Sequence, residues 1–161
     1  MAGKRSVVVS RVIPAPSEQV WRVVDDTSRY AEWVPQTLAV TRNDGEAVVG
    51  ATYDERNAVV GPIKGSSRWR VVERDPGRYS RHEGEGLPLV SNISIEFRTE
   101  PAGESTEVTS TLRYDSTLGP LGALIDRVAH GQTVAAQEKA LANLEELVVR
   151  ERQAAAAATP R

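Results

Sequence analysis

The chain contains no cysteine among its 161 residues. Without cysteine there can be no disulfide framework, no thiolate nucleophile and no metal site that uses thiolate ligands. A site that needs a nucleophile, a proton carrier or a metal ligand must therefore use other side chains. Histidine, which titrates near neutral pH, occurs only twice, as His82 and His130.

The chain also lacks a surplus of one charge and a long hydrophobic run. Its 20 basic and 22 acidic residues give a formal net charge of −2, so no excess positive charge points to nucleic acid or to an anionic membrane. The opening MAGKRSVVVSRV has no apolar stretch of signal-peptide length, and no other segment is long and apolar enough to span a bilayer. We therefore expect a cytoplasmic protein with no nucleic-acid partner and no integral membrane segment.

Several catalytic motifs are missing as well. The chain has neither the Gly-x-Ser-x-Gly elbow of a hydrolase nor a His-Glu-x-x-His helix. The segment GEGLP is a turn rather than a phosphate loop, because neither a lysine nor a helix follows it. A metal site would need His82 and His130 to converge with carboxylates such as Glu83 or Glu85, and no spacing typical of metal ligands in the sequence supports this. We expect no metal ion and no cofactor.

Turn signals and residue patterns predict the order of the elements. A β-branched strand stops at Pro14, and two short helices follow it, one in EQVWRVVDD and one in RYAEW. Six strands separated by Gly, Pro, Asn and Asp come next, and a long helix ends the chain. The predicted strands are Ser6–Ile13, Thr37–Arg42, Ala51–Val60, Ser66–Arg74, Arg78–Glu83, Val90–Arg98 and Thr106–Asp115. Strands that are bracketed by helices rather than alternating with them indicate an α+β fold.

The long helix, predicted from Pro120 to Glu151, is the only segment able to cross the whole domain. About 30 helical residues would run about 45 Å. Its apolar residues change phase near His130-Gly131, so we predict a bend or a close backbone contact at Gly131. The first half would then cover something that the second half packs beneath. The two stripes are Leu121, Leu124, Ile125 and Val128 before the change, and Val134, Leu141, Leu144 and Val148 after it.

Alternation along the strands predicts a sheet with one apolar face. Ile93, Ile95 and Phe97 share a face, opposite a row of polar residues, and we expect this apolar face to meet the long helix. The strands Ala51–Val60 and Arg78–Glu83 are polar on both faces. Either they lie at an edge, or some of their polar groups point inward into a space that is not fully packed.

No linker or internal repeat divides the chain, so we predict a single domain. It covers residues 6–151, with an N-terminal tail at 1–5 and a flexible, alanine-rich C-terminal tail at 152–161. We expect a monomer or a homodimer.

The chain resembles a known superfamily over nearly its whole length. APSEQVWRVVDDTSRYAEWVP looks like the opening signature of the START-like (SRPBCC) superfamily, which includes Bet v 1-like proteins and polyketide cyclase/dehydrase-type proteins, and we expect a bacterial member. The matching features are Ala15-Pro16, Val20-Trp21, Asp25-Asp26 and Trp33-Val34-Pro35. VVERDPGR and the closing helix are also similar to the family. The resemblance implies a helix-grip fold, in which a curved antiparallel sheet of about seven strands surrounds a C-terminal helix and leaves an internal cavity.

The cavity implied by this resemblance would be lined by the apolar face of the sheet, the second short helix and the inner side of the long helix. The alternative is that the same residues fill an ordinary core. The candidates for ligand binding are Trp33, Tyr53, Trp69, Ile95, Phe97, Tyr114, His130, Val134 and Leu141.

Four residues are candidates for proton transfer or substrate positioning: His130, Tyr114, Arg81 and His82. Strand parity places His82 on one face and Arg81 on the other without deciding which of them is inward. A solvated His82 is the favoured interpretation, whereas His130 shares the stripe of Val134 and can point inward or to solvent. No motif fixes a catalytic role for any of the four.

Three functions remain open from the sequence. The first is a binding protein that holds a hydrophobic or amphipathic small molecule, such as a lipid, a polyketide or an aromatic compound. The second is a polyketide aromatase/cyclase, which uses the same cavity to fold and dehydrate a poly-β-ketone. The third is a regulatory interaction protein with a filled core. The resemblance bears on the first two functions only at the level of the superfamily.

Overall fold

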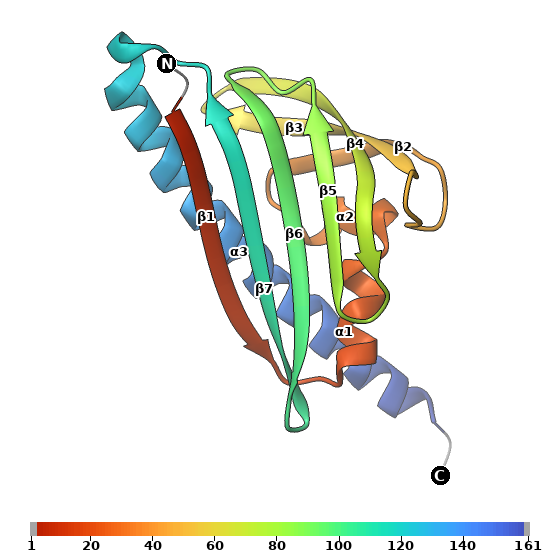
Figure 1. Ribbon diagram of the computed structural model, residues 1–161. Helices are drawn as coiled ribbons and strands as arrows, with labels where there is room; N and C mark the ends of the chain where they lie inside the picture. Colours follow the sequence, from red (N-terminus) through yellow and green to blue (C-terminus); the bar gives the residue numbers. More distant parts are fainter. Residues whose placement is uncertain (1–2, 160–161) are drawn as a thin grey trace.

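The structure, a computed structural model that describes residues 3–159, joins seven strands in one antiparallel sheet (Figure 1). Neighbours in the chain pair with each other from β2 to β7, and β1 completes the sheet beside β7, giving the order β1-β7-β6-β5-β4-β3-β2. The strands are β1 (Gly3–Ile13), β2 (Thr37–Asn43), β3 (Thr52–Val60), β4 (Ile63–Asp75), β5 (Tyr79–Glu85), β6 (Val90–Ala102) and β7 (Ser105–Ser116).

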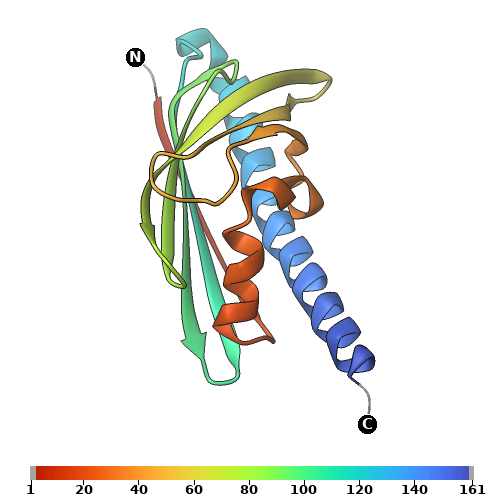
Figure 2. The same cartoon turned by 90° about the vertical axis from the view of Figure 1, so that its right-hand side faces the viewer.

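The helices all lie on the concave side of the sheet. Figure 2 shows the sheet curving around the long helix α3, with the short helices beside it. The helices are α1 (Ser17–Val24), α2 (Tyr30–Trp33) and α3 (Ala123–Ala158), with single 3₁₀ turns at Thr27–Arg29 and Pro120–Gly122. This arrangement confirms the predicted α+β helix-grip fold, including the two short helices after the first strand.

The turns between strands follow the glycine and proline signals of the sequence. In the β4–β5 turn, Gly77 has φ 82° and the N–H of Arg78 donates to the carbonyl of Asp75 at 3.0 Å. Proline before a glycine of positive φ is the pattern of a type II turn. The predicted strand end before Pro101 is wrong, because Pro101 remains in β6 and pairs with Thr106. Pairing with β5 stops at Arg98, so the missing N–H of Pro101 lies where that edge of β6 is free.

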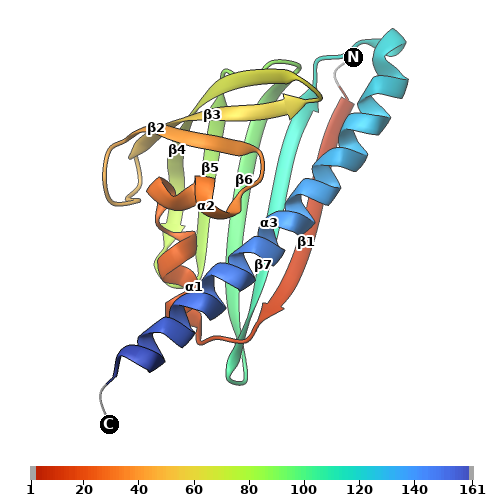
Figure 3. The same cartoon turned by 180° about the vertical axis from the view of Figure 1, so that it is seen from behind.

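Part of the hydrophobic core lies between the sheet, α1 and the C-terminal half of α3, which Figure 3 shows together at one end of the molecule. Val20 and Val24 of α1, Val108 of β7 and Leu144 of α3 are fully buried there. Their burial removes apolar surface from water, which is the main force that holds helices and sheet together. Asp26 is the N-cap of the 3₁₀ turn that follows α1, and its side chain accepts a hydrogen bond from the backbone N–H of Ser28 at 3.1 Å, as the capping pattern predicts.

The helix α3 is continuous, which corrects the prediction at Gly131. It runs without interruption from Ala123 to Ala158, and a Cβ atom built at Gly131 would meet nothing within 4 Å. The helix also continues beyond the predicted end at Glu151. The phase of the apolar residues changes for another reason: the first half presents Asp126 and Gln137 to the sheet, while Leu124 is 74% exposed on the outside.

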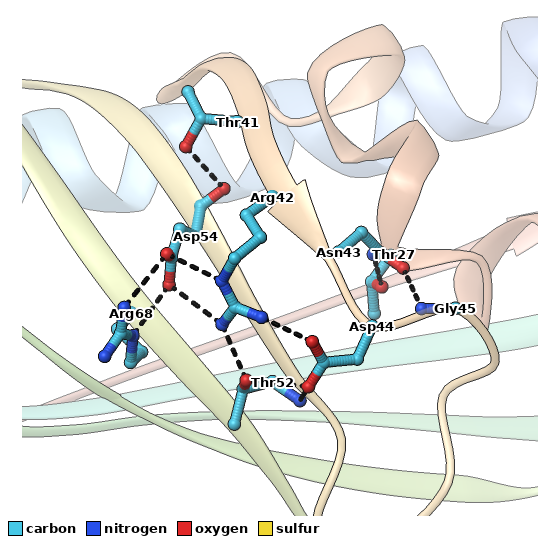
Figure 4. A network of polar contacts seen from close by, with 9 residues as sticks. All are labelled: Thr27, Thr41, Arg42, Asn43, Asp44, Gly45, Thr52, Asp54 and Arg68. Atoms are coloured by element: carbon cyan, nitrogen blue, oxygen red, sulfur yellow. Dashed lines mark hydrogen bonds and ion pairs between the residues drawn. The ribbon is translucent and has the colours of Figure 1, made fainter.

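The outer face of β2, β3 and β4 carries a network of charged side chains (Figure 4). Asp54 of β3 accepts hydrogen bonds from Arg42 Nε at 3.0 Å and from Arg68 Nε at 2.9 Å. Arg42 also pairs with Asp44. Exposed pairs of this kind contribute little to stability, but they show that an outward carboxylate in this strand finds basic partners.

None of the helices within residues 3–159 combines the length and the apolar character that crossing a membrane requires. In the same range, no three His, Asp or Glu side chains come together as a metal site would need.

Candidate functional site

A partly open cavity of about 130 Å³ lies between the N-terminal half of α3 and the concave face of the sheet. It is bordered by β3, β4, β6 and β7, by the loop between β5 and β6, and by Ile125, Ala129 and Thr133 of α3. An engineered protein cavity of about 150 Å³ is large enough to bind benzene. The cavity therefore has room for a group about the size of one ring.

Aromatic side chains form much of the cavity wall. The chain has only three tryptophans, four tyrosines and one phenylalanine, and five of these line the cavity: Tyr30, Tyr53, Trp69, Phe97 and Tyr114. The rings of Tyr53 and Trp69 are stacked, with centroids 6.4 Å apart, and Tyr30 meets Tyr53 edge to face at 5.6 Å. Rings held by one another in this way present a rigid apolar surface to a ligand.

Behind this wall, Tyr53 is hydrogen-bonded to a buried histidine. The hydroxyl of Tyr53 lies 2.8 Å from Nδ1 of His82, whose side chain is 1% exposed and packs against Tyr30 and Phe97. Burial lowers the pKa of His82 from 6.5 to about 4, with a smaller opposing effect from Asp25. His82 is therefore neutral at pH 7, and the favoured interpretation as a solvated strand residue is wrong.

A strand glycine gives Trp69 its place. A Cβ atom at Gly84 of β5 would lie 2.8 Å from ring atoms of Trp69, which is closer than real contacts allow. Gly84 pairs directly with Trp69 across β4 and β5. The absence of a side chain at Gly84 thus lets the indole lie against the backbone of β5.

Polar side chains of β3 and β4 form a chain of hydrogen bonds beside the rings. Trp69 Nε1 donates to Ser67 Oγ at 2.8 Å, Ser67 Oγ donates to Asn57 Oδ1 at 2.6 Å, and Asn57 Nδ2 donates to Glu55 Oε2 at 2.9 Å. Burial raises the pKa of Glu55, while the hydrogen bond from Asn57 acts in the opposite direction. Glu55 is the last acceptor of the chain, and its side chain lines the cavity.

The helix α3 supplies the opposite wall. Gln137 is buried and accepts a hydrogen bond from Ser110 Oγ of β7 at 2.9 Å. Asp126 pairs with Arg5 of β1, and this guanidinium lowers the pKa of Asp126. Gln137 Oε1 and the Asp126 carboxylate thus already have partners on the sheet.

The structure brings five of the predicted ligand-binding residues to the cavity. These are Tyr53 of β3, Trp69 of β4, Ile95 and Phe97 of β6, and Tyr114 of β7. They come from four strands but share the concave face, as the alternation of their strands predicts.

The other four predicted ligand-binding residues lie elsewhere. Trp33 and Leu141 are each 1% exposed within the packed core, where Trp33 meets Phe97 edge to face from the side of α2. Val134 packs against the core without lining the cavity. His130 is half-buried, and its Nδ1 lies 3.4 Å from the hydroxyl of Tyr114. Residues of the long helix that come later in the chain contribute to packing because α3 moves away from the cavity along its length.

Among the candidates for proton transfer, Arg81 faces away from the cavity. It pairs with Glu73 and Glu83 on the outer face of the sheet. His82 has the opposite parity in β5 and points inward. This outcome corrects the candidate role of Arg81. It also answers the question left open for the polar strands β3 and β5, which are both interior strands of the sheet. The inward polar groups of β3 border the cavity, whereas His82 of β5 is packed among aromatic rings.

Sequence reasoning missed Tyr30, Glu55, Asn57 and Gln137 as cavity residues. A signal existed for two of them, because Tyr53, Glu55 and Asn57 have the same parity in β3 and must share a face. With Tyr53 placed inward, Glu55 and Asn57 should have been placed inward as well. Tyr30 and Gln137 had no comparable signal, since their positions depend on how the helices approach the sheet.

Comparison with known proteins gives a consistent result. The model of a family described as polyketide cyclase / dehydrase and lipid transport matches residues 4–149. A search of curated protein sequences found no match.

Solved structures share the fold over most of their length. The crystal structure of TTHA0849 from Thermus thermophilus has 27% sequence identity and a TM-score of 0.73, over 91% of this chain and 99% of that one. The Zhui aromatase/cyclase from Streptomyces sp. R1128 has 24% identity and a TM-score of 0.67, over 94% of each chain. Norcoclaurine synthase from Thalictrum flavum has 15% identity and a TM-score of 0.66, over 92% of this chain and 88% of that one. The last two likenesses show the fold alone.

Proposed function

The chain belongs to the polyketide cyclase/dehydrase and lipid transport family, and we propose that its cavity binds a hydrophobic or amphipathic small molecule. The observation that carries the proposal is the cavity of about 130 Å³ with five aromatic side chains in its wall. Ligand sites in proteins are concave and mostly apolar, with a few polar groups that orient the ligand. In this cavity the rings would provide affinity, and Glu55, Asn57 and Thr37 would provide orientation.

A cavity-filling substitution tests this proposal. Ala129 of α3 lines the cavity, and Ala135 of the same helix is exposed. We expect Ala129→Phe to reduce the affinity for a ring-sized probe, benzyl alcohol, by about tenfold or more, because the new ring occupies the space of the ligand. Affinity is measured by the chemical shifts of protein amides during a titration.

Ala135→Phe is the matched control and should leave the affinity unchanged. Equal affinity in the two variants would place the binding outside the cavity and contradict the proposal.

A second candidate function is ring closure of a poly-β-ketone, and the Tyr53–His82 pair favours it. In such a step the enol carbon of the substrate attacks a ketone carbon. The enol hydroxyl loses its proton, and the ketone oxygen gains one to become a hydroxyl. Tyr53 lines the cavity, and its hydroxyl lies 2.8 Å from His82 Nδ1. This hydroxyl would donate the second proton and recover the first. Positioning of a reactive chain would supply most of the remaining catalysis.

Product analysis separates the two candidates. If Tyr53 transfers the proton, Tyr53→Phe should slow cyclisation of a synthetic poly-β-ketone by about a hundredfold or more. Arg81→Ala, which changes only the outer face, should have no effect. An unchanged rate and product distribution for Tyr53→Phe would leave the chain as a binding protein without this chemistry.

A further inference from the structure

The charges of the cavity are of one sign. Among the described residues that line it, the only ones with a formal charge at neutral pH are Glu55 and Asp126, and no lysine, arginine or histidine is present. Asp126 has its own partner in Arg5. Glu55 is 4% exposed and takes part in no ion pair with any residue between 3 and 159. The cavity thus contains one buried carboxyl without a basic counterpart.

The neighbouring residue of the same strand shows how unusual this is. Asp54 points outward from β3 and accepts hydrogen bonds from two arginines (Figure 4). Glu55 points inward, where its hydrogen-bond donors are neutral side chains. A buried carboxylate without a cation is costly, so a positive charge brought into the open cavity beside Glu55 would be stabilised there.

The hydrogen-bond chain fixes how Glu55 is held. An indole N–H can only donate, so Trp69 makes Ser67 an acceptor, and the single hydroxyl hydrogen of Ser67 goes to Asn57 Oδ1. The amide nitrogen of Asn57 must then face Glu55, to which it donates. Every donor in this series of three hydrogen bonds points toward the carboxyl of Glu55. This order supports negative charge on Glu55 and anchors its Oε2 atom, while the side chain borders the cavity.

The aromatic wall favours the same kind of ligand group. Tyr30, Tyr53 and Trp69 all line the cavity, and Tyr53 precedes Glu55 on the inward face of β3. Trp69 lies opposite Tyr53 on β4. The faces of aromatic rings attract cations, most strongly when water is excluded. A carboxyl beside tyrosine and tryptophan rings therefore suits an organic cation, whereas a carboxylate or phosphate ligand would meet like charge and no basic residue.

We propose that the ligand of this cavity carries a basic amine, which pairs with Glu55, on an apolar body of about one ring. The proposal deepens the proposed function and rests on it, because it specifies the ligand class of the same cavity. Glu55 acts as the specificity determinant: the rings accept any small apolar body, and the carboxyl selects the cation.

Three probes with the same ring and different head groups test the inference: benzylamine, benzyl alcohol and benzoate. Binding to the wild-type protein is measured for each by amide chemical shifts. Hydrogen bonds between an ammonium group and a carboxylate are stronger than those between neutral groups, so we expect benzylamine to bind about tenfold tighter than benzyl alcohol, and benzoate to bind most weakly.

The variant Glu55→Gln keeps the shape of the side chain and removes its charge. We expect it to abolish the advantage of benzylamine over benzyl alcohol. An amide spectrum with the dispersion of the wild type reports that the fold survives. Glu83→Gln removes one negative charge from the outer face and should leave the tenfold preference in place.

The possible failures are distinguishable. If benzyl alcohol binds as tightly as benzylamine, or if the preference survives in Glu55→Gln, the amine inference is wrong and the binding function stands. A protonated Glu55 that donates to a neutral carbonyl would give the first of these results. If none of the three probes binds to the wild-type protein, the proposed function and the amine inference both fail.

Discussion

At the scale of single residues, His82 is the clearest case of a group whose properties are set by burial. It is surrounded by Tyr30, Tyr53 and Phe97, and its one hydrogen bond is to Tyr53. The Nε2 atom is buried and has no partner among the described residues. A protonated imidazole would therefore place an uncompensated charge in an apolar site, which explains why its pKa falls to about 4.

This lowered pKa predicts how stability depends on pH. In the unfolded chain His82 takes up a proton below about pH 6.5, whereas in the folded protein it does so only below about pH 4. The contribution of neutral His82 to the free energy of unfolding is complete above pH 6.5 and is lost as the pH falls toward 4. Between pH 7.5 and pH 4.5, the free energy of unfolding should fall by roughly 2–3 kcal/mol more in the wild type than in His82→Gln.

Urea denaturation at the two pH values measures this difference. The raised pKa of Glu55 acts in the opposite direction, but it is present in both proteins and cancels in the comparison. Parallel losses of stability in the two proteins would mean that His82 titrates as it does in water.

At the scale of elements, α3 has two unlike halves on one continuous axis. The first half borders the cavity with Asp126, Ala129 and Gln137, and the second half packs through Leu141 and Leu144. The sequence predicted that the first half covers something that the second half packs beneath. The first half does border the cavity, but mainly through Asp126 and Ala129, whereas Leu124 and Val128 of the predicted stripe are exposed. The prediction attributed the change of phase to the backbone at Gly131. A stripe pattern does not reveal that the inward residues of a helix face a cavity rather than a packed core.

Gly131 should therefore be replaceable. It is exposed in the interior of α3, its φ is not positive, and a Cβ atom would contact nothing. We expect Gly131→Ala to raise the free energy of unfolding by about 0.5–1 kcal/mol, because alanine loses less backbone entropy in a helix. Urea denaturation at pH 7.5 measures the change.

Ala135→Gly, at another exposed position of α3, provides the reciprocal control and should lower stability by a similar amount. A loss of stability in Gly131→Ala would show that a glycine is required at this point of the helix.

At the scale of the whole molecule, the fold was predictable and the site was predictable in part. Element order, turn signals and strand parity are local properties, and they suffice to place Trp69, Phe97 and Tyr114 on the concave face. The cavity depends on how far the sheet curves away from α3, which is not a local property. For this reason Trp33 and Leu141 were assigned to the cavity although they belong to the core, and Tyr30 was not assigned to it.

The cavity wall includes residues that the hydrophobic core does not use, and this bears on how such proteins diversify. Leu144, Val108 and Val24 belong to the core and do not line the cavity, whereas Glu55 and Asn57 line the cavity and lie outside the core cluster. Exchanging one of these two polar residues of β3 would alter what the cavity admits without removing the apolar contacts that hold the sheet and helices together. One ancestral scaffold can thus acquire new occupants by single substitutions, each tested by selection against an unchanged background of stability.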